Sequence, residues 1–153
     1  MLHIRRYEPQ DNAIVKELHV AGLKQVGAGP NDPVWDSDLD DIENVYIKNR
    51  GDFLVGLLDN EIVAIGAIKK YSETCGEIKR IRIRRDCQRK GYGETILLKL
   101  IELARKLGYQ ELVLDTMASN LPAQQLFKKT GFHEIRRGAI GPFNVIYYGN
   151  KLK

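Results

Sequence analysis

The stretch Glu-Ile-Lys-Arg-Ile-Arg-Ile-Arg-Arg-Asp-Cys-Gln-Arg-Lys-Gly-Tyr-Gly, residues 77–93, decides the fold of this 153-residue chain. Ile81 and Ile83 alternate with charged residues, which predicts a strand, and a basic loop with two glycines follows. From Glu94 to Leu107, apolar residues recur at helical spacing. A strand, a glycine loop and a helix in this order leave the first helical N–H groups beside a loop with little bulk. Such a place binds phosphate.

Positive charge is concentrated in the same stretch. Between positions 79 and 90, seven basic residues stand against one acid, whereas the whole chain has a net charge of only +4. The basic character is therefore local, which favours a site for one compact polyanion and disfavours a general nucleic-acid binder. A solvated edge of arginines is the plain alternative, and the two glycines argue against it.

Two motifs carry a family resemblance. Residues 88–93, Gln-Arg-Lys-Gly-Tyr-Gly, resemble the Gln/Arg-x-x-Gly-x-Gly/Ala loop of the GNAT family of N-acetyltransferases, which binds the pyrophosphate of acetyl-coenzyme A. A Rossmann loop would need a glycine where Ile96 stands, and no stretch fits the Walker pattern. Residues 120–132, Asn-Leu-Pro-Ala-Gln-Gln-Leu-Phe-Lys-Lys-Thr-Gly-Phe, are similar to the family segment Asn-x-x-Ala-x-x-Leu-Tyr-x-x-x-Gly-Phe. The close resemblance covers residues 76–132.

The periodicities predict the element order β-α-α-β-β-β-α-β-α-β-β, which is the order that the family uses. Strands are expected at residues 2–7, 53–58, 62–69, 77–83, 111–116, 132–137 and 143–152, and helices at 11–25, 37–51, 94–107 and 120–129. The resemblance implies the α/β (α+β) class, with a mixed, mostly antiparallel central sheet flanked by helices. Residues 1–153 are expected to form a single domain.

The strand at 77–83 has an irregular phase. Ile81 and Ile83 share one face, but strict alternation places Ile78 on the other. A β-bulge between them would restore the phase. It would also splay the strand from its neighbour and leave unpaired backbone groups for a ligand.

Composition limits the other expectations. No apolar run is long enough to span a membrane, and the N-terminus lacks a signal-peptide pattern. Cys75 and Cys87 form no disulfide framework, so both are expected to be reduced and the protein cytoplasmic. The three histidines show no ligand spacing, so no metal is expected.

The resemblance implies acetyl-coenzyme A as co-substrate. Backbone N–H groups of residues 88–93 would hold the pyrophosphate, and Gly91 and Gly93 would let it approach closely. The backbone N–H near Ile83 would polarise the acetyl carbonyl. Asn120 would face the cofactor or serve as a plain helix cap, and the two roles have equal weight. Glu94 suits the helix dipole but must turn away from the phosphates. The full set of expected cofactor contacts is Ile81, Arg82, Ile83, Gln88, Arg89, Lys90, Gly91, Tyr92, Gly93, Glu94, Thr95, Asn120, Ala123 and Phe127.

Catalysis needs a neutral amine and a general base. Glu77 stands where several relatives have a catalytic glutamate; a strand residue ion-paired with Lys79 and Arg80 is an alternative of at least equal weight. Relatives often protonate the leaving thiolate with a tyrosine where this chain has Phe127. Either another group serves or none is needed. Tyr147 and Tyr148 are the substitute candidates and Tyr92 is a weaker one, although ordinary strand packing is the more common role of the two strand tyrosines. Alternation lets only one of them face the cleft.

The acceptor is the least determined part. An acidic group in the first two helices and their loop would suit an amine, or would simply reflect helix-start chemistry, which is slightly favoured. Its members are Asp32, Asp36, Asp38, Asp40, Asp41 and Glu43. Trp35 beside them could pack a substrate or the core.

The expected function is therefore transfer of an acetyl group from acetyl-CoA to a primary amine of a small molecule or peptide, by direct attack with help from a general base. The alternative, motivated by Phe127, is a non-catalytic acyl-CoA-binding regulatory module. A nucleic-acid binder ranks a distant third, because no pattern of exposed aromatic residues supports base stacking. Homodimer formation, the acyl-chain preference and the choice between protein and small-molecule acceptors stay open.

Overall fold

A computed structural model describes residues 1–25 and 37–152 of the protein. Seven strands form one sheet in the order β1-β2-β3-β4-β5-β7-β6, and all neighbours are antiparallel except β4 and β5. This is the mixed, mostly antiparallel sheet that was expected. The strands are β1 His3–Arg6, β2 Asp52–Leu58, β3 Glu61–Lys70, β4 Cys75–Ile83, β5 Glu111–Met117, β6 His133–Ile140 and β7 Phe143–Lys151.

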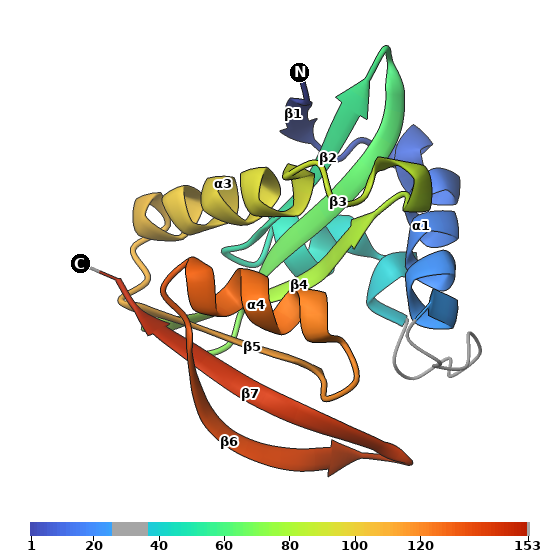
Figure 1. Ribbon diagram of the computed structural model, residues 1–153. Helices are drawn as coiled ribbons and strands as arrows, with labels where there is room; N and C mark the ends of the chain where they lie inside the picture. Colours follow the sequence, from blue (N-terminus) through green and yellow to red (C-terminus); the bar gives the residue numbers. More distant parts are fainter. Residues whose placement is uncertain (26–36, 153) are drawn as a thin grey trace.

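Helices cover both faces of the sheet (Figure 1). The described α-helices are α1 Asn12–Gln25, α3 Tyr92–Lys106 and α4 Leu121–Lys129, and the short helices are η1 Pro9–Asp11, η2 Ser37–Asp40, η3 Glu43–Ile47 and η4 Arg85–Cys87. One buried cluster contains the inner sides of α3 and α4, with Ile96, Leu100 and Phe127 among its members. A second cluster, around Val15 and Tyr46, joins α1, η2 and η3 to strands β2 and β3. The sheet therefore has a core on each side.

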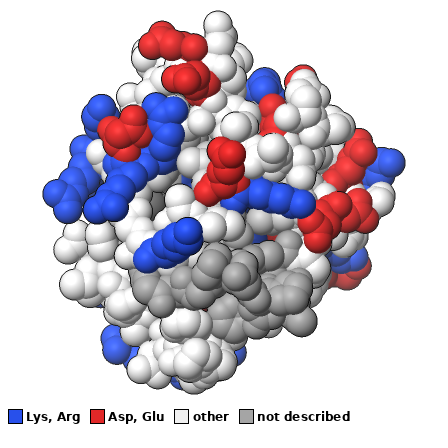
Figure 2. Space-filling view, turned by 90° about the vertical axis from the view of Figure 1, so that its right-hand side faces the viewer, with Lys and Arg blue, Asp and Glu red and all other residues white. Residues whose placement is uncertain are grey.

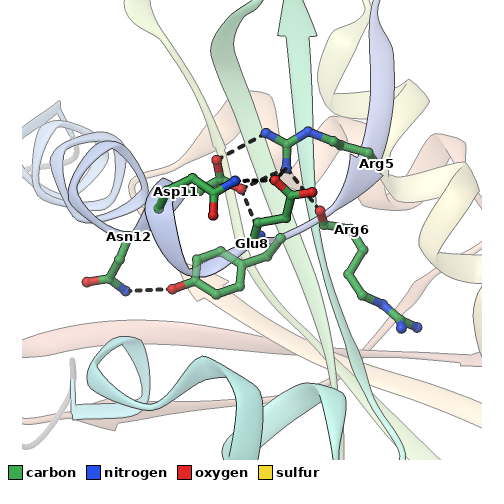
Figure 3. A network of polar contacts seen from close by, with 7 residues as sticks. Arg5, Arg6, Glu8, Asp11 and Asn12 are labelled. Atoms are coloured by element: carbon green, nitrogen blue, oxygen red, sulfur yellow. Dashed lines mark hydrogen bonds and ion pairs between the residues drawn. The ribbon is translucent and has the colours of Figure 1, made fainter.

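A network of hydrogen bonds and ion pairs connects β1 to the start of α1 (Figure 3). The Arg5 guanidinium donates to both carboxylate oxygens of Asp11 at 2.8 and 3.0 Å, and the Glu8 amide donates to the same carboxylate at 2.8 Å. Asp11 was expected to begin and cap α1, but it ends the 3-10 turn η1, and α1 begins at Asn12. The reason is that both oxygens of Asp11 are occupied by donors that precede the helix.

The buried face of α1 differs from the predicted one. The apolar spacing predicts that Ile14, Val15, Leu18 and Ala21 share the buried face. Val15 and Leu18 are buried, but Ile14 and Ala21 are exposed and His19 is buried instead. Gly22 explains this rotation, because a Cβ there would lie 2.3 Å from Cδ of Arg82 in β4. The helix thus turns its glycine, rather than an alanine, toward the central strand.

The expected helix at 37–51 is two shorter pieces. The 3-10 turn η2 precedes the π-helix η3, in which the Lys48 amide donates to the Glu43 carbonyl at 2.8 Å. The apolar spacing predicts Leu39, Ile42, Val45 and Tyr46 as the inward residues; three of them are buried and Val45 is half-buried. The regular α-helix was wrong: η3 has the wider hydrogen bonding of a π-helix, a local variant that apolar spacing does not reveal.

Turn chemistry was largely predictable. Asp59 and Asn60 have φ of 50° and 66°, as the hairpin between β2 and β3 requires. Gly131 ends α4 with φ of 101°. The last hairpin turns at residues 141–142, so Gly138 lies inside β6 and the expected strand end at 137 was too early.

Candidate active site

A β-bulge in β4 shapes the centre of the site. Lys79 pairs with Ala67 and Arg82 with Ile65, so two residues of β4, Arg80 and the one after it, stand opposite Gly66 alone. Arg80 accommodates the bulge with φ of 61°. Ile78, Ile81 and Ile83 consequently all belong to or pack against the cluster under α3. The predicted bulge and its effect on phase are confirmed.

Beyond the bulge, β4 and β5 separate. Their parallel pairing is limited to Cys75–Glu111, Gly76–Leu112 and Glu77–Val113, after which the two strands diverge (Figure 1). The predicted splay is also confirmed. Because a parallel neighbour is missing past Glu77, this side of β4 is open to a ligand lying between the strands. The carbonyls of Ile81 and Ile83 in this part of the strand already accept from the side chains of Arg82 at 3.2 Å and Gln88 at 3.0 Å.

A cleft of about 360 Å³ lies at the open end of the two strands. It gathers three segments that the sequence analysis had connected only by resemblance: the end of β4, the glycine loop and the start of α4. The expected residues that line it are Ile81, Arg82, Ile83, Gln88, Arg89, Gly91, Tyr92, Gly93, Asn120 and Ala123. Sequence reasoning missed its other lining residues, Gly22, Gln25, Cys87, Pro122 and Leu126.

The glycine loop presents free backbone groups to this cleft. Gly91, the residue before α3, has φ of 85°, and a Cβ built on it would meet no heavy atom within 4 Å. Within the described part of the chain, the amides of Arg89, Lys90 and Gly91 have no backbone hydrogen-bond acceptor. Together with the first turn of α3, they form a cradle of N–H groups that fits an anion.

Of the polar side chains around the loop, two are engaged in contacts with other residues and two are exposed. Glu94 forms a salt bridge with Lys129 of α4 at 2.7 Å and so lies outside the cleft lining, and the Thr95 hydroxyl donates to the Gly91 carbonyl at 3.0 Å. Arg89 and Lys90 are exposed. Figure 2 shows Lys and Arg side chains gathered in one part of a surface whose charges are otherwise mixed. Glu94, Thr95 and Lys90, although expected as contacts, do not line the cleft.

Asn120 serves as a helix cap, because its side chain accepts from the Ala123 amide at 3.3 Å. It also lines the cleft and the pocket next to it. The two expected roles are therefore compatible, since one amide oxygen caps α4 while the same residue forms part of the wall.

A second pocket, of about 170 Å³, lies between the diverging strands. It shares Ile81, Arg82, Asn120, Ala123 and Leu126 with the first, so the two form one trough. Glu77 and Asp115 line it from opposite strands. In the described residues, neither carboxylate has a hydrogen bond or a salt bridge, so the expected ion pairs of Glu77 with Lys79 and Arg80 do not form.

The environment raises the pKa of both carboxylic acids. Burial is the main cause for Glu77, helped by the charge of Asp115 and opposed by the positive charge of Lys79. Burial also raises the pKa of Asp115, against the charges of Lys79, Arg80 and Arg136. Part of the Asp115 side chain is exposed to solvent, while the residue also lines the pocket between the strands, where other residues surround it. Sequence reasoning missed Asp115. The pattern that could have revealed it is a single acidic residue directly after the apolar residues 112–114 of β5.

The two tyrosines of β7 point to opposite faces, as alternation required. Tyr148 is 1% exposed and packs against Phe127, with ring centroids 5.9 Å apart, so it belongs to the core. Its hydroxyl has no described hydrogen-bond partner, and burial raises its pKa. Tyr147 pairs with Asp115 across β5 and lies on the face that carries Glu77. Neither tyrosine lines the trough.

Three acids of the group expected in the first two helices and their loop make structural contacts. Asp38 accepts a bidentate ion pair from Arg80 at 2.7 and 3.0 Å and a hydrogen bond from the Tyr46 hydroxyl. Asp40 pairs with Lys16 at 2.6 Å, and Asp41 accepts from Asn44 at 3.0 Å. These contacts favour the structural alternative for the three acids. Glu43 is exposed. Asp32, Trp35 and Asp36 lie outside the described residues.

Over residues 1–25 and 37–152, no three His, Cys, Asp or Glu side chains gather as a metal site. None of the helices within these ranges is long and apolar enough to cross a membrane.

Comparisons with known sequences agree with the motifs. A family model described as "Acetyltransferase (GNAT) family" matches residues 20–132. The uncharacterized N-acetyltransferase YsnE of Bacillus subtilis (strain 168) is 40% identical over 75 residues, which are 48% of this chain and 50% of YsnE. The uncharacterized N-acetyltransferase C1271.07c of Schizosaccharomyces pombe is 29% identical over 143 residues, which are 91% of this chain and 87% of the yeast protein. The chain thus spans about half the length of the first relative and most of the second.

Solved structures agree with the fold. An acetyltransferase of the GNAT family from Staphylococcus aureus Mu50 superposes with a TM-score of 0.91 at 20% identity, and the match covers 100% of both chains. The protein yncA from Salmonella typhimurium, solved with its cofactor acetyl-CoA, superposes with a TM-score of 0.82 at 17% identity and covers 99% of this chain and 94% of its own.

Proposed function

Because the chain belongs to the GNAT family of acetyltransferases, we propose that its trough binds acetyl-CoA and transfers the acetyl group to a primary amine of a small molecule or peptide. The observation that carries this proposal is the separation of β4 from β5 directly after Glu77, beside a loop with free amides. A ligand with a phosphate end and an extended arm matches such a trough.

The residues present fit this cofactor. The cradle formed by the amides of residues 89–91 and the first turn of α3 accepts a pyrophosphate, and the open space at Gly91 gives it room. Arg89 and Lys90 add exposed positive charge. The unpaired edge of β4 around Ile81 and Ile83 takes the arm as an additional strand would, and Leu126 and Ala123 form its apolar wall.

Acetyl-CoA supplies a thioester carbonyl that a neutral amine attacks. Glu77 accepts the proton of the amine, directly or through one water, and its raised pKa brings it closer to the range in which a base works at neutral pH. Asp115, on the opposite wall, holds the amine near Glu77. Phe127 offers no proton, but a thiol with a pKa of about 8.5 is a tolerable leaving group. No tyrosine of β7 is required in this scheme.

Replacing Gly91 with tryptophan tests the cofactor position. The side chain would fill the cradle, and the φ of 85° would strain any residue other than glycine. We expect the affinity for acetyl-CoA, measured by calorimetry, to fall at least about 100-fold, since several charge-assisted hydrogen bonds of the kind worth roughly 1.5–3 kcal/mol are lost.

Leu98→Trp is the matched control. It introduces the same side chain on the same helix, at an exposed position that does not line the cleft, so we expect affinity within about 3-fold of the original. Equal affinity of the Gly91→Trp protein would place the phosphates elsewhere. Tight cofactor binding with no transfer to any amine would favour the alternative, a non-catalytic acyl-CoA-binding regulatory module.

A further inference from the structure

One face of the sheet around the split carries charges that acetyl transfer alone does not explain. Asp115 of β5, Tyr147 of β7 and Arg136 of β6 are direct cross-strand partners, so their side chains leave the sheet on the same side. Glu77 shares this side through its pairing with Val113, two residues from Asp115. Residues of four neighbouring strands thus lie on one face of the sheet, and of these Glu77 and Asp115 line the pocket between the diverging strands.

Arg136 is held in position by an aromatic ring and not by a salt bridge with a described residue. Its guanidinium carbon lies 3.7 Å from the centroid of the Tyr147 ring, a cation–π contact that fixes its direction. It is exposed and makes no salt bridge or hydrogen bond with a described residue. The next residue is also exposed but differs in its contacts, because Arg137 pairs with Glu134 at 3.0 Å.

Lys79 is the second cation of this kind. It is half-buried and lines the same pocket as Glu77 and Asp115, and no salt bridge within the described ranges includes it. Arg80 differs, since its guanidinium is bound by Asp38 at 2.7 Å. Lys79 lines the same pocket as Asp115, and Arg136 pairs with Tyr147, the cross-strand partner of Asp115. The charges of both cations oppose the burial that raises the pKa of Asp115.

Resting on the proposed acetyl transfer, we infer that the acceptor is a small zwitterion that carries a carboxylate close to its amino group, as an α-amino acid does. Its amine faces Glu77 and Asp115, and its carboxylate pairs with Arg136 and Lys79. A planar guanidinium pre-positioned on an aromatic ring binds a carboxylate through two parallel hydrogen bonds at little entropic cost. The same pair of cations repels an amine that lacks the carboxylate.

The transfer step balances with these groups. The amine nitrogen forms a bond to the acetyl carbon while the carbon–sulfur bond breaks and its electron pair leaves with sulfur. The proton lost by the amine passes to Glu77 and from there to solvent or to the thiolate. The acceptor carboxylate takes no part in bond changes, so its recognition acts on the affinity for the acceptor.

The test compares three matched acceptors: an α-amino acid, its carboxamide, and the amine with the carboxylate removed. Thiol release from acetyl-CoA gives kcat/KM for each. We expect the amino acid to exceed both others at least about 10-fold, the size of one charged hydrogen-bond pair. Arg136→Gln should raise the KM for the amino acid about 10-fold or more with little change in kcat. It should not lower kcat/KM for the decarboxylated amine and should raise it to the extent that the arginine repels that amine.

Arg137→Gln is the control, because its side chain is paired with Glu134 and projects away from Arg136. Arg137→Gln should change neither the KM for the amino acid nor kcat. Equal kcat/KM for the three acceptors, or equal effects of the two arginine variants, would overturn the zwitterion inference while leaving acetyl transfer intact. Failure of all three acceptors and of other amines would overturn the transfer proposal with it.

Discussion

Replacing Glu77 with glutamine is expected to lower kcat by about 100-fold or more, since a general base typically contributes 10²–10⁴-fold. Glutamine keeps the shape of the side chain and cannot accept the proton of the amine. The measurement is steady-state thiol release at saturating acetyl-CoA. The affinity for acetyl-CoA should stay within about 2-fold, because Glu77 lies between the strands and not at the phosphate cradle.

The pH profile adds a second readout. Activity of the intact protein should fall with decreasing pH through a pKa above the ordinary glutamate value, because burial raises the pKa of Glu77. This acidic fall in activity reports the coupled ionisation of Glu77 and Asp115. The Glu77→Gln variant should therefore shift the pH at which activity falls.

Stability separates a lost base from a damaged fold. The folded-state pKa of Glu77 exceeds its unfolded-state value, so ionisation at neutral pH costs stability and the neutral variant should unfold at an equal or higher temperature. Glu111→Gln, on the same sheet outside the trough, is the control and should keep full activity. A Glu77→Gln protein with kcat within about 3-fold of the original would assign the base to another group.

Replacing Arg80 with methionine is expected to lower the free energy of unfolding by about 3–5 kcal/mol, the usual cost of leaving one half of a buried ion pair alone. Arg80 and Asp38 are each only 12% exposed, and the pair joins the β4 bulge to η2. Urea unfolding followed by circular dichroism measures the loss. Burial acts to raise the pKa of Asp38, but the hydrogen bonds and charge of Arg80 outweigh it, so the net shift is downward.

The sign of the pH effect follows from that shift. A lowered pKa means that the Asp38–Arg80 pair stabilises the fold above the ordinary aspartate pKa and that this contribution is lost as the pH falls through the lowered value. The difference in the free energy of unfolding between the original protein and the Arg80→Met variant should therefore become smaller at acidic pH. Arg84→Met is the matched control on the same strand end. Its main partner, Asp86, is 67% exposed, so the cost should be about 1 kcal/mol or less. Equal losses in the two variants would contradict a special role for the bulge contact.

The local parts of the site could be predicted from sequence. The conflict in phase between Ile78 and Ile81 indicated the bulge, because one extra residue is the only local way to bring both to one face. Two glycines before a helical pattern indicated a loop with little bulk beside free helical N–H groups, and in the structure Gly91 has φ of 85°. Such signals are contained within a few consecutive residues, and the structure shows each of them where it was expected.

The parts that sequence reasoning missed depend on strand order. Arg136 and Tyr147 face each other within the last hairpin, but they come beside Asp115 only because β7 pairs with β5. Asp115 faces Glu77 only because their two strands are neighbours before they diverge. Neither pairing has a local signature, since residues far apart in sequence become partners only when the sheet assembles. The π-helical form of η3 is a further case in which the apolar spacing was informative and the hydrogen bonding was not.

The central claim is that the divergence of β4 from β5 creates a site of acetyl transfer, and amine-dependent thiol release tests it most directly. The intact protein is incubated with saturating acetyl-CoA, and free thiol is followed before and after addition of a mixture of small primary amines, with and without carboxylates. The account predicts thiol release that depends on the amine, scales with protein concentration and equals the amount of acetylated amine found by mass spectrometry. Saturable binding of acetyl-CoA with no thiol released by any amine would contradict it.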